Sequence, residues 1–346
     1  MRDLVTWLEN EAPAPLLDLP GLLAVRSPLR LRRAHALIRR AGQRVGRTGV
    51  QPDGVGIYLN VGHDNLAAGD MTSLANSGWR TVVMVHDTIP LDQPEYARRG
   101  TSERFRTKLA GMALADAVVC NSADTERRLS AHMPKLTALC HVLPLGITPS
   151  VPIVPQTGPP AFVILGTIEP RKNHLLLLDL WAKHWSRTGP TLHIVGRRGW
   201  ENAEVFRLMD SHPMMGRTVI EHGAISDAET RAILMQSRAL LFPSFAEGFG
   251  LPLAEALTLG VPVIASDLPA LREIGRSVPE WLAPDDASGW AEAIRDFTNP
   301  DAMRRVAQLQ RLSAWSPPTW AGHFDALEDL LKNLLETNLV HPDEGS

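Results

Sequence analysis

The sequence predicts an α/β fold built from two doubly wound domains. Short apolar segments typical of buried strands alternate with segments typical of helices, which is the order that a parallel sheet covered by helices requires. A proline-rich stretch over residues 144–160 interrupts this alternation near the middle of the chain. The length of 346 residues also suits two domains of ordinary size. We therefore expect one domain over residues 1–150, a second over 151–318 and a C-terminal helix over 319–340.

The first half contains segments with the composition of strands in a parallel sheet. These segments are residues 54–61, 81–85 and 117–120. Helices are expected over 101–114 and after Asn121 and Ser122, since Asn and Ser side chains cap helix N-termini. The strand over 81–85 runs into His86 and Asp87. Ligands of open α/β sheets bind beyond the carboxyl ends of strands, so this sequence position favours a role for both side chains.

The second half repeats the alternation of strands and helices more regularly. The expected strands are residues 161–165, 192–195, 218–220, 239–242 and 261–265. The expected helices are 174–185, 288–297 and a segment that Ser226 or Asp227 caps and that extends to Arg238.

One stretch in this half, residues 242–257, has the sequence of a strand, a glycine-bearing loop and a short helix. Pro252 suits the first position of the helix, and Gly260 suits its end. The free N–H groups at such a helix start bind anions such as phosphate. Glu247 in the loop and Glu255, expected in the first helical turn, can both accept hydrogen bonds from ligand hydroxyls. A nucleotide sugar, with phosphates between two hydroxyl-rich groups, matches this arrangement, although each glutamate alone also suits a structural role beside the helix dipole.

The same stretch resembles the nucleotide-sugar signature of the retaining glycosyltransferases of family four, the glycosyl transferases group 1. That signature consists of a glutamate, a G-F-G-x-P run and a second glutamate followed by alanine, all of which are present between Glu247 and Ala256. The resemblance implies the GT-B fold, in which two Rossmann-like domains face each other across a cleft and the last helix crosses back onto the N-terminal domain.

The resemblance also implies roles for individual residues. The run G-x-x-x-P-R-K-N at 166–173 is similar to the family's loop that carries the phosphates of the donor. The candidate catalytic residues are His86, Asp87, Arg171, Lys172 and Glu247. The candidate donor-binding residues are Gly166, Arg171, Lys172, Arg197, Gly248, Phe249, Gly250, Leu251 and Glu255.

In these roles Arg171 and Lys172 neutralise the diphosphate leaving group, and residues 248–251 offer backbone N–H groups. Glu255 accepts from the ribose hydroxyls and Glu247 lies at the donor sugar. His86 lies at the hydroxymethyl end of that sugar, and Asp87 orients His86 or assists the acceptor hydroxyl.

The expected reaction transfers a hexose to a hydroxyl of a glycan or lipid-linked glycan with retention at the anomeric carbon. The motifs around His86, Arg171 and Gly196 look like those of bacterial mannosyltransferases of polysaccharide and O-antigen assembly, which favours GDP-mannose as donor. The chain has no Asp-x-Asp metal signature, so we expect no metal and no cofactor besides the donor substrate. Two alternatives stay open, namely a UDP-sugar donor and a non-catalytic nucleotide-sugar-binding scaffold subunit.

The net charge, the absent motifs and the cysteine content bear on the partners and the location of the protein. The net charge of −3 argues against a nucleic-acid partner, and the missing G-x-G-x-x-G run argues against a dehydrogenase. No signal peptide and no apolar run of about 20 residues are evident, and the two cysteines suit a reducing compartment, so we expect a cytoplasmic protein. Residues 26–47 contain eight arginines and no acidic residue. This segment is either a helix on an anionic membrane surface or one that packs against the first sheet.

Overall fold

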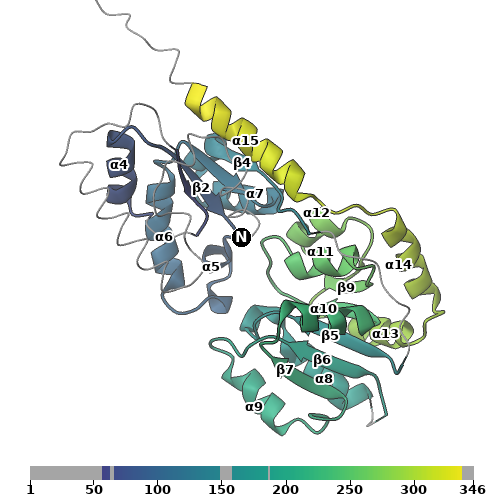
Figure 1. Cartoon of the computed structure of the whole chain (residues 1–346). Coiled ribbons are helices and arrows are strands. Elements are labelled where there is room, and N and C mark those ends of the chain that lie inside the picture. The colour runs from purple at the N-terminus through teal and green to yellow at the C-terminus, as the bar shows by residue number, and fades with distance from the viewer. Residues whose placement is uncertain (1–56, 63–65, 149–157, 186–187, 337–346) are drawn as a thin grey trace, which may run out of the picture.

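The computed structural model describes residues 57–62, 66–148, 158–185 and 188–336, which form two α/β domains (Figure 1). The basic segment 26–47 and the rest of the first fifty residues lie outside the described residues, so the expectations for them are not addressed by the structure. The boundary expected at residue 150 falls within the undescribed range 149–157 and stays a prediction.

The N-terminal domain contains a parallel four-stranded sheet in the order β1-β2-β3-β4. Its strands are β1 (Ile57–Asn60), β2 (Arg80–Val85), β3 (Ala117–Cys120) and β4 (Cys140–Val142). Its helices are α4 (Ala68–Asn76), α5 (Ile89–Asp92), α6 (Thr101–Met112) and α7 (Ala123–His132), with 3₁₀ turns η1 (Pro94–Tyr96) and η2 (Pro134–Leu139). Every residue of β2 from Thr81 to Val85 is buried, which explains why that segment is apolar and β-branched without alternation.

The C-terminal domain contains a six-stranded sheet whose described pairs are all parallel. Its strands are β5 (Ala161–Leu165), β6 (Thr191–Val195), β7 (Val219–Gly223), β8 (Ala239–Phe242), β9 (Val263–Ser266) and β10 (Glu280–Leu282). Its helices are η3 (Pro170–Lys172), α8 (His174–His184), α9 (Ala203–Ser211), α10 (Asp227–Gln236), α11 (Leu251–Thr258), α12 (Pro269–Gly275), α13 (Ala287–Thr298) and α14 (Met303–Ser313). The strand order β7-β6-β5-β8-β9-β10 is that of the doubly wound dinucleotide-binding fold, and it reverses direction between β5 and β8.

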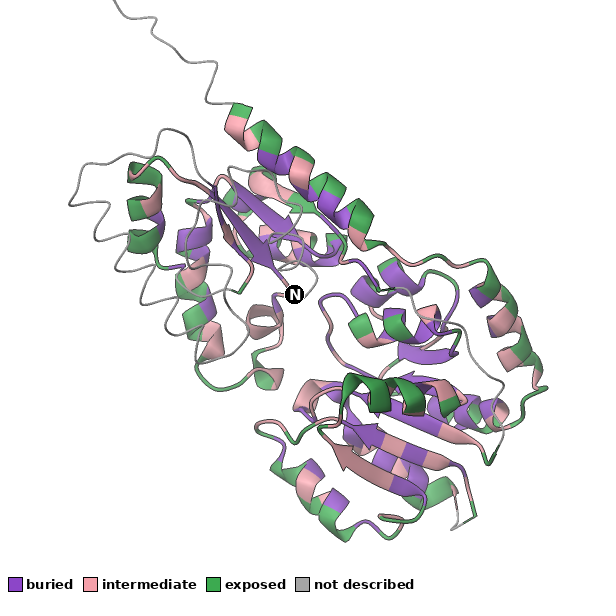
Figure 2. Cartoon of the chain, in the orientation of Figure 1, coloured by how far each residue is buried: buried purple, intermediate pink, exposed green. Residues whose placement is uncertain are grey.

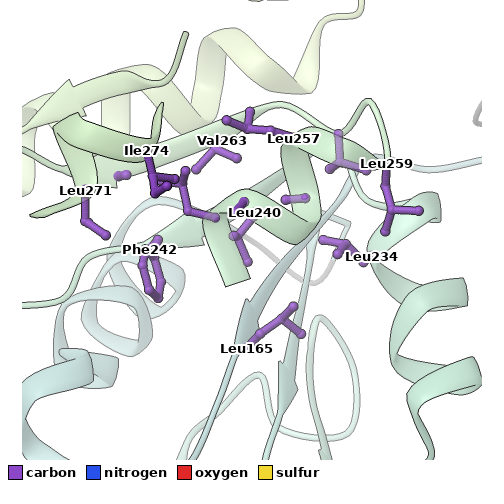
Figure 3. Close-up of a cluster of buried hydrophobic side chains, with 14 of the residues drawn as sticks. Leu165, Leu234, Leu240, Phe242, Leu257, Leu259, Val263, Leu271 and Ile274 are labelled. Carbon is purple, nitrogen blue, oxygen red and sulfur yellow. The ribbon is translucent and has the colours of Figure 1, made fainter. Parts of the chain in front are cut away.

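Apolar side chains on the two faces of the larger sheet form two separate buried clusters. Figure 2 shows buried strands between helices whose outer faces are exposed. In one cluster Phe242 of β8, Leu257 of α11 and Leu271 of α12 are buried together, as Figure 3 shows. This packing fixes the start of α11 close to the end of β8.

The last described helix, α15 (Trp320–Glu336), lies along the N-terminal domain (Figure 1). Its side chains Phe324, Leu327 and Leu331 share a buried cluster with Val82 and Met84 of β2. The C-terminal helix therefore crosses back onto the first sheet, as the resemblance implies.

The two chain segments that connect the domains lie side by side. The N–H of Ile147 donates to the carbonyl of Pro318 at 2.9 Å. A Cβ atom at Gly146 would lie 2.2 Å from the backbone nitrogen of Trp320, so only glycine permits this approach. The two connecting segments therefore contact each other directly between the domains.

We predict that Leu327→Ala destabilises the packing of α15. Leu327 is 3% exposed, and truncation of a buried leucine lowers the free energy of unfolding by about 2–5 kcal/mol. Urea unfolding followed by tryptophan fluorescence measures the change. The exposed Asp325→Ala on the same helix is the control, and equal midpoints for the two variants would contradict this packing.

Candidate functional site

The loops that follow β5 and β8 meet at the point where the strand order reverses. Two hydrogen bonds join them. The N–H of Phe245 donates to the carbonyl of Arg171 at 2.8 Å, and Nη1 of Arg171 donates to the carbonyl of Ala246 at 2.9 Å. Ligands of doubly wound sheets bind at such a reversal, beyond the carboxyl ends of the strands. The two stretches that the sequence singled out therefore form one site.

A buried cluster of ion pairs occupies this site. Oε1 of Glu247 lies 2.6 Å from Nζ of Lys172, and Oε2 lies 2.9 Å from Nη1 of Arg171. Nη2 of Arg171 also pairs with Oε1 of Glu169 at 2.6 Å. The side chains of Lys172 and Glu247 are only 6% and 8% exposed, so these charges compensate one another away from water. The structure thus brings Arg171, Lys172 and Glu247 together, while their roles stay predictions.

Burial and the neighbouring charges shift the pKa values of this cluster in opposite directions. Burial acts to raise the pKa of Glu247, but the charges of Lys172 and Arg171 outweigh burial and hold that pKa below its ordinary value. Burial lowers the pKa of Lys172, against the attraction of Glu247. Burial also raises the pKa of Glu169, although the neighbouring Arg171 opposes this shift.

Glu169 was not singled out from the sequence. It is 2% exposed and contributes one of the two carboxylates that contact Arg171. The signal that could have found it is its place two residues before Arg171 in the loop expected to carry phosphates. A buried carboxylate there needs a cation, and Arg171 is the nearest one along the chain.

Glycines shape both loops of the site. Gly250 has φ +97°, and a Cβ atom there would lie 2.4 Å from Cδ2 of Leu271. Gly166 has φ +121°, and a Cβ atom there would contact Cε of Lys172 at 3.5 Å. The sequence predicted Pro252 at the first position of helix α11. The helix begins at Leu251, so Pro252 occupies its second position. The free N–H groups of the helix start still lie directly after the loop that contains Glu247.

The prediction that Glu255 lies in the first turn of this helix is wrong. Glu255 is the fifth residue of α11 and falls in its second turn, because the helix has 3.6 residues per turn and starts at Leu251. Its carboxylate is close to Asp227 and Arg231 of α10, and partial burial followed by the charge of Asp227 raises its pKa. Its surroundings therefore differ from those of Glu247.

Arg197, Leu251 and Glu255 are the exposed residues among the candidates. Arg197 is exposed after β6, and its carbonyl accepts from the N–H of Ile168 at 2.9 Å, which links it to the loop after β5. Leu251 is 40% exposed at the start of α11. Phe249, by contrast, is buried in the core beneath that helix.

His86 and Asp87 face the site from the N-terminal domain. Nε2 of His86 lies 2.8 Å from the carbonyl of Val61, and Oδ1 of Asp87 accepts from the N–H of Ile89 at 3.1 Å. Burial raises the pKa of Asp87, and the charge of Arg171 across the domain boundary is the strongest opposing influence. Asp87 is therefore close to the ion-pair cluster.

The domains touch at Gly248. A Cβ atom at this position would lie 2.1 Å from the carbonyl oxygen of His86 and 2.8 Å from Cβ of Asp87. A cavity of about 20 Å³ remains beside this contact, lined by residues of both domains that include Asp87, Thr88, Arg128 and Glu247.

No three His, Cys, Asp or Glu side chains within the described ranges are grouped as a metal ion would require. Among the described helices, none has the length and apolarity needed to cross a bilayer.

Residues 159–299, which include both loops of the site, match the family model described as Glycosyl transferases group 1. The chain carries a glycosyl transferases group 1 domain. The serotype-specific mannosyltransferase WbdA of Escherichia coli is 30% identical over 274 residues, which cover 72% of this chain and 33% of that relative. The chain thus spans about a third of the length of this curated relative.

Two solved structures share the architecture of this chain. HepE from Anabaena, solved with UDP and glucose, has a TM-score of 0.67 at 15% identity, covering 86% of this chain and 81% of that one. The lipopolysaccharide outer core galactosyltransferase WaaB has a TM-score of 0.59 at 17% identity, covering 88% and 81%. These similarities confirm the expected GT-B fold.

We predict that the stability lost on Glu247→Gln depends on pH. Because the folded pKa of Glu247 lies below its ordinary value of 4.5, its ionised form stabilises the fold above that pH. This stabilisation is lost as the pH falls through the folded pKa. At pH 7 the variant should lose about 3–5 kcal/mol of unfolding free energy, as expected for a broken buried pair.

Urea unfolding at pH 7, 5 and 4 measures the difference between the wild type and Glu247→Gln. The difference should be constant between pH 7 and 5 and shrink below pH 4.5. Glu204→Gln, at an exposed position on α9, is the control. A difference that keeps its size at acidic pH would show that Glu247 does not act through its charge.

Proposed function

We propose that this chain is a retaining glycosyltransferase that moves a hexose from a nucleotide diphosphate sugar to a hydroxyl. The observation that carries the proposal is the buried cluster of Arg171, Lys172, Glu247 and Glu169 at the point where the sheet order reverses. Two cations there, next to the N-terminus of α11, suit the diphosphate of such a donor.

Arg171 and Lys172 act on the leaving group. As the bond to the anomeric carbon breaks, negative charge grows on the departing diphosphate, and the two cations stabilise it. Glu169 and Glu247 hold these side chains in position before the donor arrives, which removes much of the cost of orienting them. The diphosphate oxygens replace part of the contacts that the carboxylates make without a ligand.

Glu247 and the N-terminal domain act on the sugar. With both oxygens held by cations, the Glu247 carboxylate keeps lone pairs that can accept from donor hydroxyls. His86 and Asp87 approach the same place from β2. In a retaining reaction on one face of the sugar, the leaving phosphate helps to deprotonate the acceptor, and no enzyme carboxylate attacks the anomeric carbon.

We propose GDP-mannose as the donor and a hydroxyl of a glycan or lipid-linked glycan as the acceptor. The name of the E. coli relative, a mannosyltransferase, supports mannose. The structural relative solved with UDP and glucose supports the alternative of a UDP-sugar. The reaction is proposed to need no metal ion.

We predict that GDP-mannose and GDP raise the melting temperature of the protein, both with and without EDTA. A ligand at 100 times its dissociation constant adds about 2.7 kcal/mol of stability. Lys172→Ala should abolish the shift because it removes a cation from the diphosphate site, whereas Lys183→Ala, at an exposed position on α8, should retain it.

The outcomes of this experiment separate the alternatives. A shift with UDP-sugars alone would keep the enzyme class and discard GDP-mannose. A shift that EDTA abolishes would refute metal independence. No shift with any nucleotide sugar would contradict the proposed function.

We also propose that the protein binds the inner face of the cytoplasmic membrane through residues 26–47. Eight arginines without an acidic residue favour an anionic surface, each contributing on the order of 1 kcal/mol. Sedimentation with anionic vesicles should show binding that decreases with salt and is lost when these arginines are changed to glutamine. Equal binding to neutral vesicles would contradict the proposed electrostatic binding of residues 26–47 to the membrane.

A further inference from the structure

The carboxylate of Glu273 joins the domains at a second place. Glu273 belongs to α12 of the C-terminal domain, and its oxygens accept from the N–H groups of Ala123 at 2.8 Å and Asp124 at 2.7 Å. These are the first two N–H groups of α7 in the N-terminal domain, which have no partner within their own helix. A negative charge is also favoured at a helix N-terminus. Glu273 thus caps a helix of the other domain.

The same end of α7 contacts the loop that contains Glu247. Oγ of Ser122 donates to the carbonyl of Gly248 at 2.7 Å, and Oγ1 of Thr125 lies 3.2 Å from the same oxygen. Both hydroxyl residues are 2% exposed, so this contact is shielded from water. The carbonyl of Gly248 is therefore within hydrogen-bonding distance of two hydroxyls of the opposite domain, whose oxygens lie 2.9 Å from each other.

These contacts fix the orientation of the peptide group between Gly248 and Phe249. The described chain has no cis peptide bond, so the N–H of Phe249 points away from the carbonyl of Gly248 and hence away from α7. Within the described residues this N–H has no hydrogen-bond partner. It directly precedes Gly250, the residue that caps α11, so it adds to the unpaired N–H groups at the start of that helix.

Aromatic and polar contacts support the same loop from the N-terminal domain. The rings of Tyr96 and Phe245 stack with centroids 5.3 Å apart and planes 8° apart. Elsewhere between the domains, Oε1 of Glu201 in the loop after β6 accepts from the N–H of Arg99 at 3.1 Å. The stacking of Tyr96 on Phe245 therefore adds to the contacts that Arg171 and Lys172 make with this loop, and it exists only while the domains are together.

We propose that Ser122, Thr125 and Glu273 are positioning residues that couple domain closure to the geometry of the donor site. Closure places the hydroxyls of Ser122 and Thr125 on the carbonyl of Gly248 and thereby aims the N–H of Phe249 at the phosphates or sugar of the donor. Glu273 holds α7 in the place where these hydroxyls reach. Opening removes both hydroxyls from the carbonyl and frees the peptide group to rotate. This inference rests on the proposed function for the identity of the ligand.

The first test measures how far apart the domains are and does not depend on activity. Small-angle X-ray scattering of the full chain should give a larger radius of gyration for Glu273→Ala than for the wild type. Glu273→Gln keeps one acceptor oxygen and should show a smaller increase. Hydrogen exchange of the peptide that covers residues 245–253 should be faster in both. Glu292→Ala, at an exposed position on α13, is the matched control. Scattering and exchange equal to the wild type in Glu273→Ala would overturn the inference, whatever the activity.

The second test measures transfer with the nucleotide sugar that stabilises the wild type. The double variant Ser122→Ala, Thr125→Val should lower kcat/KM for the donor by about tenfold or more, since the carbonyl of Gly248 loses its donors. Its melting temperature without nucleotide should change much less than that of Glu247→Gln. Unchanged kcat/KM in the double variant would also overturn the inference. If instead the wild type binds no nucleotide sugar, the proposed function fails, while the scattering and exchange results still decide whether Glu273 holds the domains together.

Discussion

The ion pairs between Glu247 and the two cations Arg171 and Lys172 are the interaction on which the site depends. Charges that leave water must be compensated where they end up, and here the compensation comes from loops that follow different strands. The pairs therefore join the loop after β5 to the loop after β8. They also hold two cations at the one place in the sheet where a diphosphate is expected to bind.

The cluster contains more carboxylates than cations. Asp87, Glu169 and Glu247 lie around Arg171 and Lys172, and burial raises the pKa of the first two, although Arg171 opposes both shifts. These carboxylates compensate the charges of the buried Lys172 and the partly buried Arg171. Under the proposed function, the donor diphosphate competes with these carboxylates for Arg171 and Lys172, so the affinity for a donor reflects an exchange of partners.

Local patterns in the sequence were sufficient for the elements around the site. Continuous apolar segments predicted β2 and β8, Ser122 and Ser226 cap the helices where a cap was expected, and the glycine-rich stretch forms the turn before α11. Each of these features depends on neighbours along the chain. The error at Glu255 came from a shift of one residue in the expected start of the helix, which is enough to move a side chain into the next turn. The contact of Glu273 with Asp124 joins residues 149 positions apart, and no local pattern carries such a pairing.

Gly248 takes part both in the local structure of its loop and in the contact between the domains. From the sequence it is part of a glycine-bearing loop that offers backbone N–H groups to a ligand. In the structure its missing side chain is required by the other domain, because the carbonyl oxygen of His86 occupies the space where a Cβ atom would lie. The same residue offers its carbonyl to Ser122 and lies next to the carboxylate that binds Lys172. A single position therefore joins the ion-pair cluster to the contact between the domains, so that the geometry of the site and the closure of the domains depend on each other.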